Sequence, residues 1–284
     1  MSATTASQIA LAIIAAYQGG PPVIVATVIA APPADSERVG AKMLVRADGS
    51  VLGTLGGYAL DDTAQAFAPE AFRRHGVETV YLSADAHPMS RQDAAAGISY
   101  QVMVEVHERP ATLLVIGGGH VGKALATIGH LCGFSIELVD DRPEFASAER
   151  FPEADRITCG RFEEVLRDYP IDSNTYVVCV TRGHKHDQTS LSLVAESPAA
   201  YVGMIGSKRR VRAVLQYLVA EGMPVAAAER VHTPIGLDIG AETPEEIAIS
   251  IMAEIIQARR GGTGASMRAP KISRPDEDVP SRSS

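Results

Sequence analysis

The stretch Thr112-Leu-Leu-Val-Ile-Gly-Gly-Gly-His-Val-Gly122 decides the fold of the second half of the chain. It places an apolar, strand-like run directly before a Gly-x-Gly-x-x-Gly pattern, and a helix-forming segment follows. In that context the glycines allow a tight turn and a close approach of the backbone to a phosphate, and the helix N-terminus attracts the anion. The stretch predicts a strand, a turn and a helix that bind a nucleotide or a phosphate ester; the alternative is a purely structural glycine turn.

The rest of this half repeats the alternation of short apolar runs and helical stretches. Fully apolar strands separated by helices are typical of a parallel sheet that is covered on both faces. We therefore expect an α/β fold with a C-terminal doubly wound, Rossmann-like parallel sheet. The expected strands span 112–116, 136–139, 156–159, 176–181 and 201–205, and the expected helices lie near 121–131, 162–168, 186–196 and 208–221.

The first half predicts a smaller mixed α/β domain. Asp48-Gly49 stands between two strand-like runs and predicts a hairpin in which both turn residues have positive φ. Arg109-Pro110 marks the expected boundary. The expected units are an N-terminal domain over 1–110, the Rossmann-like domain over 111–260, and a tail over 261–284 whose polar, aperiodic composition predicts disorder. Further expected elements of the first half are helices over 5–18 and 59–75 and strands over 23–30, 77–82 and 98–106.

A last helix begins with Thr243-Pro-Glu-Glu246, a capping box with proline at the first helical position. Its polar residues repeat at intervals of three or four, which predicts one narrow polar stripe on an otherwise buried helix. The partner surface for its apolar face is either internal or on a second copy of the chain. The stripe consists of Glu246, Ser250, Glu254 and Gln257.

Composition excludes several classes of function. The 284 residues carry a formal net charge of −8, spread evenly along the chain, so no basic half is present to bind nucleic acid or an anionic membrane. The three cysteines stand far apart in apolar runs and predict buried thiols in a reducing compartment. Because no Lys or Arg precedes Arg38, we expect no signal peptide. The apolar stretch from Ile9 to Ala16 is far shorter than the roughly 20 residues of a membrane span, so we expect no membrane span and a cytoplasmic location.

Acidic residues follow the second expected strand of the Rossmann-like half, at Asp140 and Asp141. An acid at this distance from the glycine turn can bond ribose hydroxyls, which favours a dinucleotide without a 2′-phosphate. The adjacent Arg142 can accept a 2′-phosphate, so the choice of nucleotide stays open.

Thr181-Arg-Gly-His-Lys-His-Asp187 follows the fourth strand, where ligands of open α/β sheets bind. His184 and Asp187 are therefore candidate catalytic residues. A His-x-His-Asp run also suggests a metal site, but histidines at i and i+2 point apart on a strand, so we predict no metal. A phosphate- or pterin-facing loop and an ordinary solvated loop are the remaining interpretations.

Gly206-Ser-Lys-Arg-Arg-Val-Arg212 follows the fifth strand and begins a helix. Cations at a helix N-terminus are unfavourable beside the helix dipole unless an anion lies between them, so Lys208 is a candidate phosphate ligand. Ser207 is a candidate helix cap. The alternative interpretation is a basic, solvated helix face. Pro234-Ile-Gly-Leu-Asp-Ile-Gly-Ala-Glu242 is unusually apolar for a loop and is expected to pack near the site. Its Asp238 and Glu242 are further candidate catalytic acids, with helix caps and turn residues as the alternative. The predicted ligand-binding residues are Gly117, Gly118, Gly119, His120, Val121, Gly122, Asp140, Asp141, Arg142, Thr181, Arg182, Gly183, His184, Gly206, Ser207 and Lys208.

Taken together, these strings resemble the xanthine dehydrogenase accessory protein family, XdhC/CoxI or CoxF. In the second half the resemblance is carried by the glycine turn and by Val139-Asp-Asp-Arg-Pro-Glu-Phe-Ala146, Thr181-Arg-Gly-His184, Tyr201-Val-Gly-Met-Ile-Gly-Ser-Lys208 and Pro234-Ile-Gly-Leu-Asp-Ile-Gly-Ala-Glu-Thr-Pro-Glu-Glu-Ile-Ala248. In the first half it is carried by Gly40-Ala-Lys-Met-Leu-Val45 and Gly53-Thr-Leu-Gly-Gly57.

The resemblance implies a maturation factor for molybdenum hydroxylases. Such proteins bind the molybdenum cofactor, a pterin that carries a phosphate, support its sulfuration and deliver it to an apo-hydroxylase. The implied partners are a xanthine dehydrogenase-like apo-enzyme and a cysteine desulfurase, and a homodimer fits the family. Two alternatives use the same glycine turn: an NAD(P)-dependent oxidoreductase with His184 as general acid, and a nucleotide-sensing regulatory module.

One departure from the family concerns thiols. Family members often carry Cys directly after the Gly-Gly of the first domain and another near its last strand. This chain has Tyr58 after Gly56-Gly57 and Ala96-Gly-Ile98 in the later stretch. Because residues 1–110 contain no cysteine, a thiolate ligand or persulfide from this domain is excluded.

Overall fold

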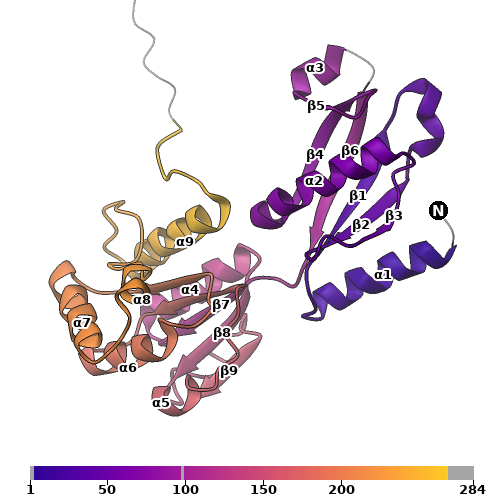
Figure 1. The fold of residues 1–284 in the computed structure, drawn as a ribbon. Coiled ribbons are helices and arrows are strands. Elements are labelled where there is room, and N and C mark those ends of the chain that lie inside the picture. The colour runs from indigo at the N-terminus through magenta and orange to yellow at the C-terminus, as the bar shows by residue number, and fades with distance from the viewer. Residues whose placement is uncertain (1–2, 97–98, 268–284) are drawn as a thin grey trace, which may run out of the picture.

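The computed structural model describes residues 3–96 and 99–267, and it builds the first half around an antiparallel sheet (Figure 1). Its strands are β1 (Val23–Ala30), β2 (Lys42–Arg46), β3 (Val51–Gly53), β4 (Val77–Ser83), β5 (Pro88–Met89) and β6 (Ser99–His107), in the order β3-β2-β1-β6-β4-β5. The helices are α1 (Ala3–Tyr17), the short 3-10 helix η1 (Pro33–Arg38), α2 (Tyr58–Arg74) and α3 (Arg91–Ala96).

Alternate residues of this sheet face two helices. On one face α2 buries Leu60 and Ala64 against Ile24. On the other face α1 buries Ile9 against the next residue of the same strand, Val25. Because successive side chains of a strand point to opposite faces, this alternation makes the first half a layered α/β unit, as predicted.

The hairpin at Asp48-Gly49 forms, but its turn differs from the expectation. Only Gly49 has a positive φ, of 82°, and its N–H donates to the carbonyl of Arg46 at 2.9 Å. The Asp48 carboxylate accepts from the Ser50 N–H at 2.9 Å. The turn therefore has a single left-handed glycine, because the Asp48 side chain satisfies the backbone without a second left-handed residue.

The second half contains the predicted parallel sheet. Its strands are β7 (Thr112–Ile116), β8 (Ser135–Asp140), β9 (Arg156–Cys159), β10 (Thr175–Cys179) and β11 (Tyr201–Met204), in the order β11-β10-β7-β8-β9. The helices are α4 (His120–Leu131), α5 (Phe162–Val165), α6 (His184–Val194), α7 (Lys208–Ala220), α8 (Val225–Glu229) and α9 (Pro244–Arg260). This strand order is that of a doubly wound Rossmann-like domain, which confirms the predicted fold class.

Both faces of this sheet are buried, and neighbouring residues of one strand belong to different cores. Leu113 packs with α4 and α9, whereas Leu114 packs with α5, α6 and α7. Among the cysteines only Cys179 is buried, and burial raises the pKa of its thiol to about 12. Cys132 and Cys159 are exposed, so the prediction that all three are buried was wrong: both stand at the ends of their elements, where the apolar run stops.

The helix α9 has the predicted capping box, but only the first residue of its polar stripe, Glu246, is exposed. The Thr243 hydroxyl accepts from the Glu246 N–H at 3.2 Å. Ser250 is buried and donates to the Leu237 carbonyl at 2.5 Å, while Ile249 is exposed. Ser250 and Glu254 face inward because the segment before the helix supplies an acceptor, the Leu237 carbonyl, and a donor, the Gly236 N–H, which a spacing pattern cannot reveal.

The two halves meet through few polar contacts. The Arg260 guanidinium donates to the carbonyls of Arg74 and His75 at 2.7 and 2.9 Å, and Arg109 pairs with Asp172 at 2.5 Å. The domain boundaries at 110 and 260 stay a prediction, and most of the predicted disordered tail lies outside the described residues. None of the described helices is long and apolar enough to span a bilayer.

Leu114 allows a test of the doubly covered sheet. We expect Leu114→Ala to lower the free energy of unfolding by about 2–5 kcal/mol, because a fully buried leucine of a central strand leaves a cavity. The control is Leu131→Ala, since Leu131 is 80% exposed. Urea denaturation followed by circular dichroism measures both, and equal losses would contradict the assignment of the core.

Candidate functional site

The carboxyl ends of the parallel strands bring the predicted site segments to one edge of the second sheet. The Gly117–Gly122 turn follows β7, and the Thr181–Asp187 segment follows the neighbouring strand β10. From β7 the chain passes to α4 on one face, and from β10 it passes to α6 on the other. This divergence is the topological switch point at which open α/β sheets bind ligands.

Three glycines of the turn are required by the fold. A Cβ on Gly117 would lie 2.6 Å from the Val180 carbonyl oxygen, and the φ of Gly117 is 116°. A Cβ on Gly118 would lie 2.2 Å from the Phe145 carbonyl oxygen, and one on Gly122 would lie 2.0 Å from the Gly117 carbonyl oxygen. These glycines allow backbone segments to pass closer than any side chain permits.

Gly119 is different, because nothing in the fold requires a glycine there. Its φ is −64°, and a Cβ at this position would meet no atom within 4 Å. It is the N-cap of α4, and no side chain caps the helix. The first N–H groups of a helix have no intrahelical acceptor, and the adjacent His120 is exposed. The position combines free space with backbone donors, which suits an anion.

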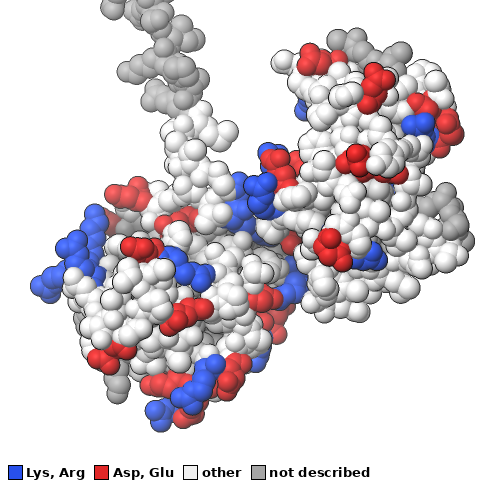
Figure 2. Space-filling model, viewed as in Figure 1, with Lys and Arg blue, Asp and Glu red and all other residues white. Residues whose placement is uncertain are grey.

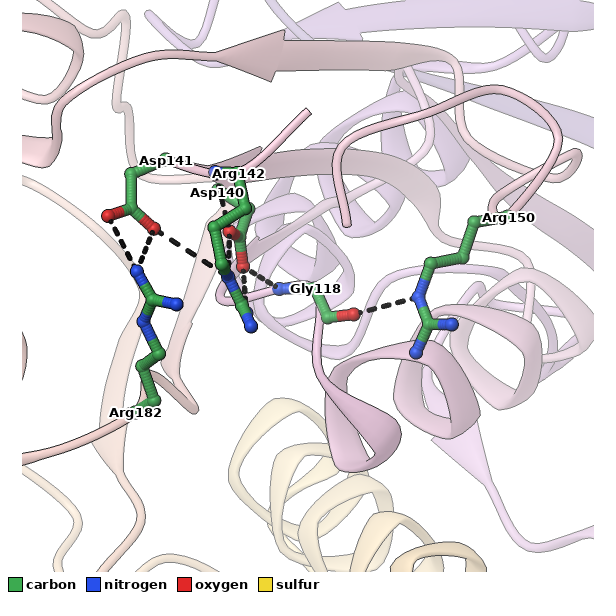
Figure 3. A network of polar contacts seen from close by, with 6 residues as sticks. All are labelled: Gly118, Asp140, Asp141, Arg142, Arg150 and Arg182. Atoms are coloured by element: carbon green, nitrogen blue, oxygen red, sulfur yellow. Dashed lines mark hydrogen bonds and ion pairs between the residues drawn. The ribbon is translucent and has the colours of Figure 1, made fainter. Parts of the chain in front are cut away.

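The turn is held by the carboxylate of Asp140, which is hydrogen-bonded to Gly118 (Figure 3). Asp140 is 1% exposed and accepts from the Gly118 N–H at 2.7 Å. Its other hydrogen bonds come from Arg142: the backbone N–H at 3.0 Å, Nε at 2.9 Å and Nη2 at 3.0 Å. Burial acts to raise the pKa of Asp140, but the hydrogen bonds from Arg142 and Gly118 outweigh it and lower the pKa.

This arrangement does not favour the predicted contact between Asp140 and a ribose. Each carboxylate oxygen already accepts two hydrogen bonds, so no lone pair is directed to a ligand. Arg142 is likewise engaged by Asp140 and lies over the Phe145 ring, with Cζ 3.5 Å from the ring centroid. We assign both residues to positioning of the glycine turn.

Arg150 and Phe145 complete this support, and sequence reasoning missed both. Arg150 Nε donates to the Gly118 carbonyl at 3.0 Å, and its guanidinium lies 5.0 Å from the Phe145 ring centroid (Figure 3). Phe145 thus packs between two arginines, each bonded to the turn or to its carboxylate. The sequence offered one signal for this support. Phe145 follows the second strand of the parallel sheet, with Arg142 three residues before it and Arg150 five residues after it.

Arg182 is the cation beside the switch point. It is 52% exposed, and its Nη2 pairs with Asp141 at 3.1 Å. This ion pair joins the segment after β10 to the segment after β8 across the intervening turn of β7. The structure therefore brings Asp141 and Arg182 together at the predicted edge, with Arg182 accessible to an anion.

Asp187, a predicted catalytic candidate, is occupied by other residues. It is fully buried, accepts from the Thr181 hydroxyl and pairs with Arg210 of α7. Because both oxygens are engaged away from solvent, we correct its role to a lock between the loop after β10 and α7. The side chain of His184 lies outside the described residues; its backbone begins α6, after Gly183 with a φ of 85°.

The third segment, after β11, borders a separate hollow. The Ser207 hydroxyl caps α7 by accepting from the Arg210 N–H at 3.3 Å, as expected. Lys208 is exposed and, with Gly206, lines a cavity of about 440 Å³ against the loop 234–241. The structure thus separates Lys208 from the glycine turn by the width of one strand, β10.

The described side chain of His186, in α6, belongs to no metal site among the residues that the structure describes. His186 packs edge-on against Phe162, with ring centroids 5.4 Å apart. Within 3–96 and 99–267, leaving aside the His184 side chain, no group of three His, Cys, Asp or Glu is placed to hold a metal ion.

The glycine assignments yield a paired test. We expect Gly122→Ala to destabilise the protein by about 1–3 kcal/mol, because its Cβ would overlap the Gly117 carbonyl. Gly119→Ala should change stability by less than about 0.5 kcal/mol, because its Cβ enters open space. Thermal denaturation of both variants checks this, and a marked loss in Gly119→Ala would show that Gly119 is structural.

The buried carboxylate predicts a pH dependence. Because the folded pKa of Asp140 is lowered, its stabilising contribution is complete above its ordinary value of 3.8 and is lost as the pH falls further. We expect Asp140→Asn to cost about 1–3 kcal/mol at pH 7 and progressively less below pH 3.8. Denaturant titrations from about pH 7 to about pH 3 measure the difference, and Asp238→Asn, in the loop 234–241 away from the turn, is the control.

Comparison with known proteins identifies the family. Residues 113–255 match the family described as XdhC Rossmann domain, and residues 16–82 match the XdhC and CoxI family. The chain is 33% identical over 239 residues to the uncharacterized protein YqeB of Escherichia coli K12, over 82% of this chain and 43% of that protein. It is 33% identical over 148 residues to a probable subunit of the xanthine dehydrogenase of Bacillus subtilis 168, over 52% of this chain and 43% of that protein.

The chain therefore spans less than half the length of these curated relatives. Among solved structures, a xanthine dehydrogenase of Bacillus halodurans has a similar fold, with a TM-score of 0.52 and 22% identity over 88% of this chain and 95% of that chain. The Rossmann match covers half of the chain by itself, and the second match falls on the antiparallel half. The chain belongs to the XdhC family.

Proposed function

We propose that this protein is a maturation factor that binds the molybdenum cofactor, supports its sulfuration and delivers it to a molybdenum hydroxylase of the xanthine dehydrogenase type. The cofactor is cargo here, and its phosphate is the group that the chain can recognise. Family membership supports this role, as does the name of a similar protein of Bacillus subtilis, which links it to xanthine dehydrogenase.

The observation that carries the proposal is the space at Gly119. Three glycines of the turn are explained by backbone packing, but Gly119 is explained only by what approaches it from outside. The uncapped first turn of α4 supplies N–H donors to a phosphate, and Arg182 supplies a positive charge at the adjacent strand end.

The same geometry argues against a dinucleotide. NAD would need an acid that is free to bond the ribose, and Asp140 is saturated by Gly118 and Arg142. NADP would need a free arginine for its 2′-phosphate, and the Arg142 guanidinium is engaged by Asp140. A phosphorylated pterin needs no such contact. We therefore prefer the pterin cargo and treat nucleotide binding as an outcome of the test.

Charge supports a protein client over a nucleic acid. Figure 2 shows acidic and basic side chains dispersed over the visible face, with a small basic group over α7. The proposed partners are the apo-hydroxylase and a cysteine desulfurase, which supplies the sulfur; residues 1–110 carry no thiol that could hold it as a persulfide. Tyr58, which stands where relatives often carry Cys, is 84% exposed at the start of α2. We include a homodimer and a cytoplasmic location in the proposal.

Gly119→Val tests the proposal directly. We expect the variant to fold, because a Cβ there is unhindered, and to lose binding of the isolated molybdenum cofactor by about 100-fold or more, because the valine fills the phosphate space. Pterin fluorescence after gel filtration measures retention, and activation of an apo-hydroxylase measures delivery. The matched control is Gly262→Val, at an exposed glycine beyond α9.

Calorimetric titration separates the alternatives. The wild-type protein should bind a pterin phosphate and should bind NAD, NADP and ATP far more weakly. Tight binding of NAD, together with hydride transfer to a small substrate, would replace the maturation role with that of an oxidoreductase. Equal cofactor retention by wild type and a folded Gly119→Val variant would overturn the placement of the phosphate.

A further inference from the structure

A cavity of about 440 Å³ beside the end of β11 is separate from the glycine turn Gly117–Gly122. Its walls come from three elements that are distant in sequence: the turn Ile205–Lys208, the loop 234–241 and the α9 side chains Ile247 and Ser250. The turn Ile205–Lys208 follows β11 directly, so the cavity opens at the same carboxyl edge of the sheet as Gly119.

The part of the loop wall formed by Gly236 and Leu237 is hydrogen-bonded to α9. The Gly236 N–H donates to Glu254 at 2.9 Å, and the Leu237 N–H donates to the Ser250 carbonyl at 3.2 Å. The Ser250 hydroxyl donates back to the Leu237 carbonyl at 2.5 Å. A Cβ on Gly236 would lie 2.4 Å from Ser250 Oγ, so the loop lies directly on α9. This part of the wall therefore presents a preformed surface to a ligand.

The lining combines apolar side chains with two charges. Ile205, Ile235 and Leu237 supply a surface on which a flat ring can pack. Asp238 and Lys208 line the same space. In the part of the chain that the structure describes, neither charge forms an ion pair or a side-chain hydrogen bond, unlike the fully engaged carboxylates of Asp140 and Asp187.

The loop also offers backbone donors to this space. The N–H groups of 238–241 bond no acceptor among the described residues, whereas those of Gly236 and Leu237 are both engaged. The part of the loop that bears Asp238 thus keeps its hydrogen-bonding groups available, while the part that lies on α9 does not.

We infer that this cavity binds the aminopyrimidinone ring of the pterin, with Asp238 accepting from the ring N–H and the exocyclic amine and Lys208 donating to the ring carbonyl oxygen. The edge of that ring presents one acceptor and two adjacent donors. An ammonium and a carboxylate provide the complementary set, and the apolar walls cover the ring faces. The inference rests on the proposed function, since it places the second end of the same cargo.

The spacing of the sheet is compatible with one cargo at both positions. β7 and β11 are separated by β10 alone, which places them about 10 Å apart at a typical spacing between strands. A multi-ring pterin with a phosphate at its far end spans a distance of this order. Arg182 follows β10, but its guanidinium pairs with Asp141 after β8, on the side of the glycine turn away from β11. We therefore assign Arg182 to the phosphate end of the cargo.

The test uses unphosphorylated pterin, 2-amino-4-oxopteridine, because it lacks the group that the glycine turn recognises. Fluorescence titration of the full chain should show saturable binding. We expect Asp238→Asn to weaken it by about 10- to 100-fold, since a charged acceptor of two hydrogen bonds is lost. Glu242→Gln, a nearby carboxylate outside the cavity lining, is the control and should bind like wild type.

A second probe tests the recognised edge. Lumazine, 2,4-dioxopteridine, replaces the exocyclic amine by an oxygen, which would face the Asp238 carboxylate, so we expect it to bind at least about tenfold more weakly than pterin. Equal binding of pterin and lumazine, no loss in Asp238→Asn, or no binding of pterin to the wild type would each overturn the inference.

The glycine variant keeps this inference distinct from the proposed function. Gly119→Val should bind unphosphorylated pterin like the wild type. For a pterin phosphate, it should lose the additional affinity that the phosphate gives the wild type. If pterin binds through Asp238 but phosphate adds nothing, the phosphate turn is refuted and the ring cavity stands. If Gly119→Val abolishes the gain from the phosphate but Asp238→Asn does not change the affinity for pterin, the ring cavity is refuted and the glycine turn remains supported.

Discussion

The buried carboxylate of Asp140 is the constraint on which the site depends. It joins three parts of the second half: the end of β8, the turn after β7 through Gly118, and the Arg142 guanidinium that packs on Phe145. A buried carboxylate is tolerated only when its oxygens are fully hydrogen-bonded, and here four hydrogen bonds achieve this. The backbone of the turn is therefore fixed before any ligand arrives, and the open position at Gly119 is a consequence of that rigidity.

Around this point the parallel sheet arranges the other polar groups by their strand ends. Asp141 and Arg182 flank the turn as an ion pair, and Asp187 locks the neighbouring loop to α7. The carboxylates therefore serve two different purposes. Those at the centre maintain the backbone, while Asp238, which lines the cavity beside the outer strand, keeps its oxygens available within the described chain. A ligand that bridges the centre and the outer cavity matches this arrangement better than a dinucleotide.

Several expectations about exposure and turn geometry were wrong, because they were read from local sequence patterns. The polar stripe of α9 predicted exposed Ser250 and Glu254, but the loop 234–241 lies on that side and engages both. Two cysteines in apolar runs proved exposed, because they stand at the ends of their elements. The hairpin at Gly49 formed with one left-handed residue, since the Asp48 side chain stabilised a different turn. In each case the element was predicted correctly and its surroundings were not.

Sequence by itself determined the order of the main strands and helices, the parallel sheet, the glycine turn after β7 and the strand ends at which the site lies, but not the short elements η1, β5, α3 and α8. These follow from hydrophobic periodicity and glycine spacing, which act over a few neighbouring residues. Tertiary structure alone decided which of the predicted polar residues remain free. Asp140 and Asp187 look like ligand-binding acids in the sequence but are saturated by arginines, whereas Asp238 has no partner within the described chain. Hydrogen bonds between residues far apart in the chain depend on packing, and no local spacing encodes them.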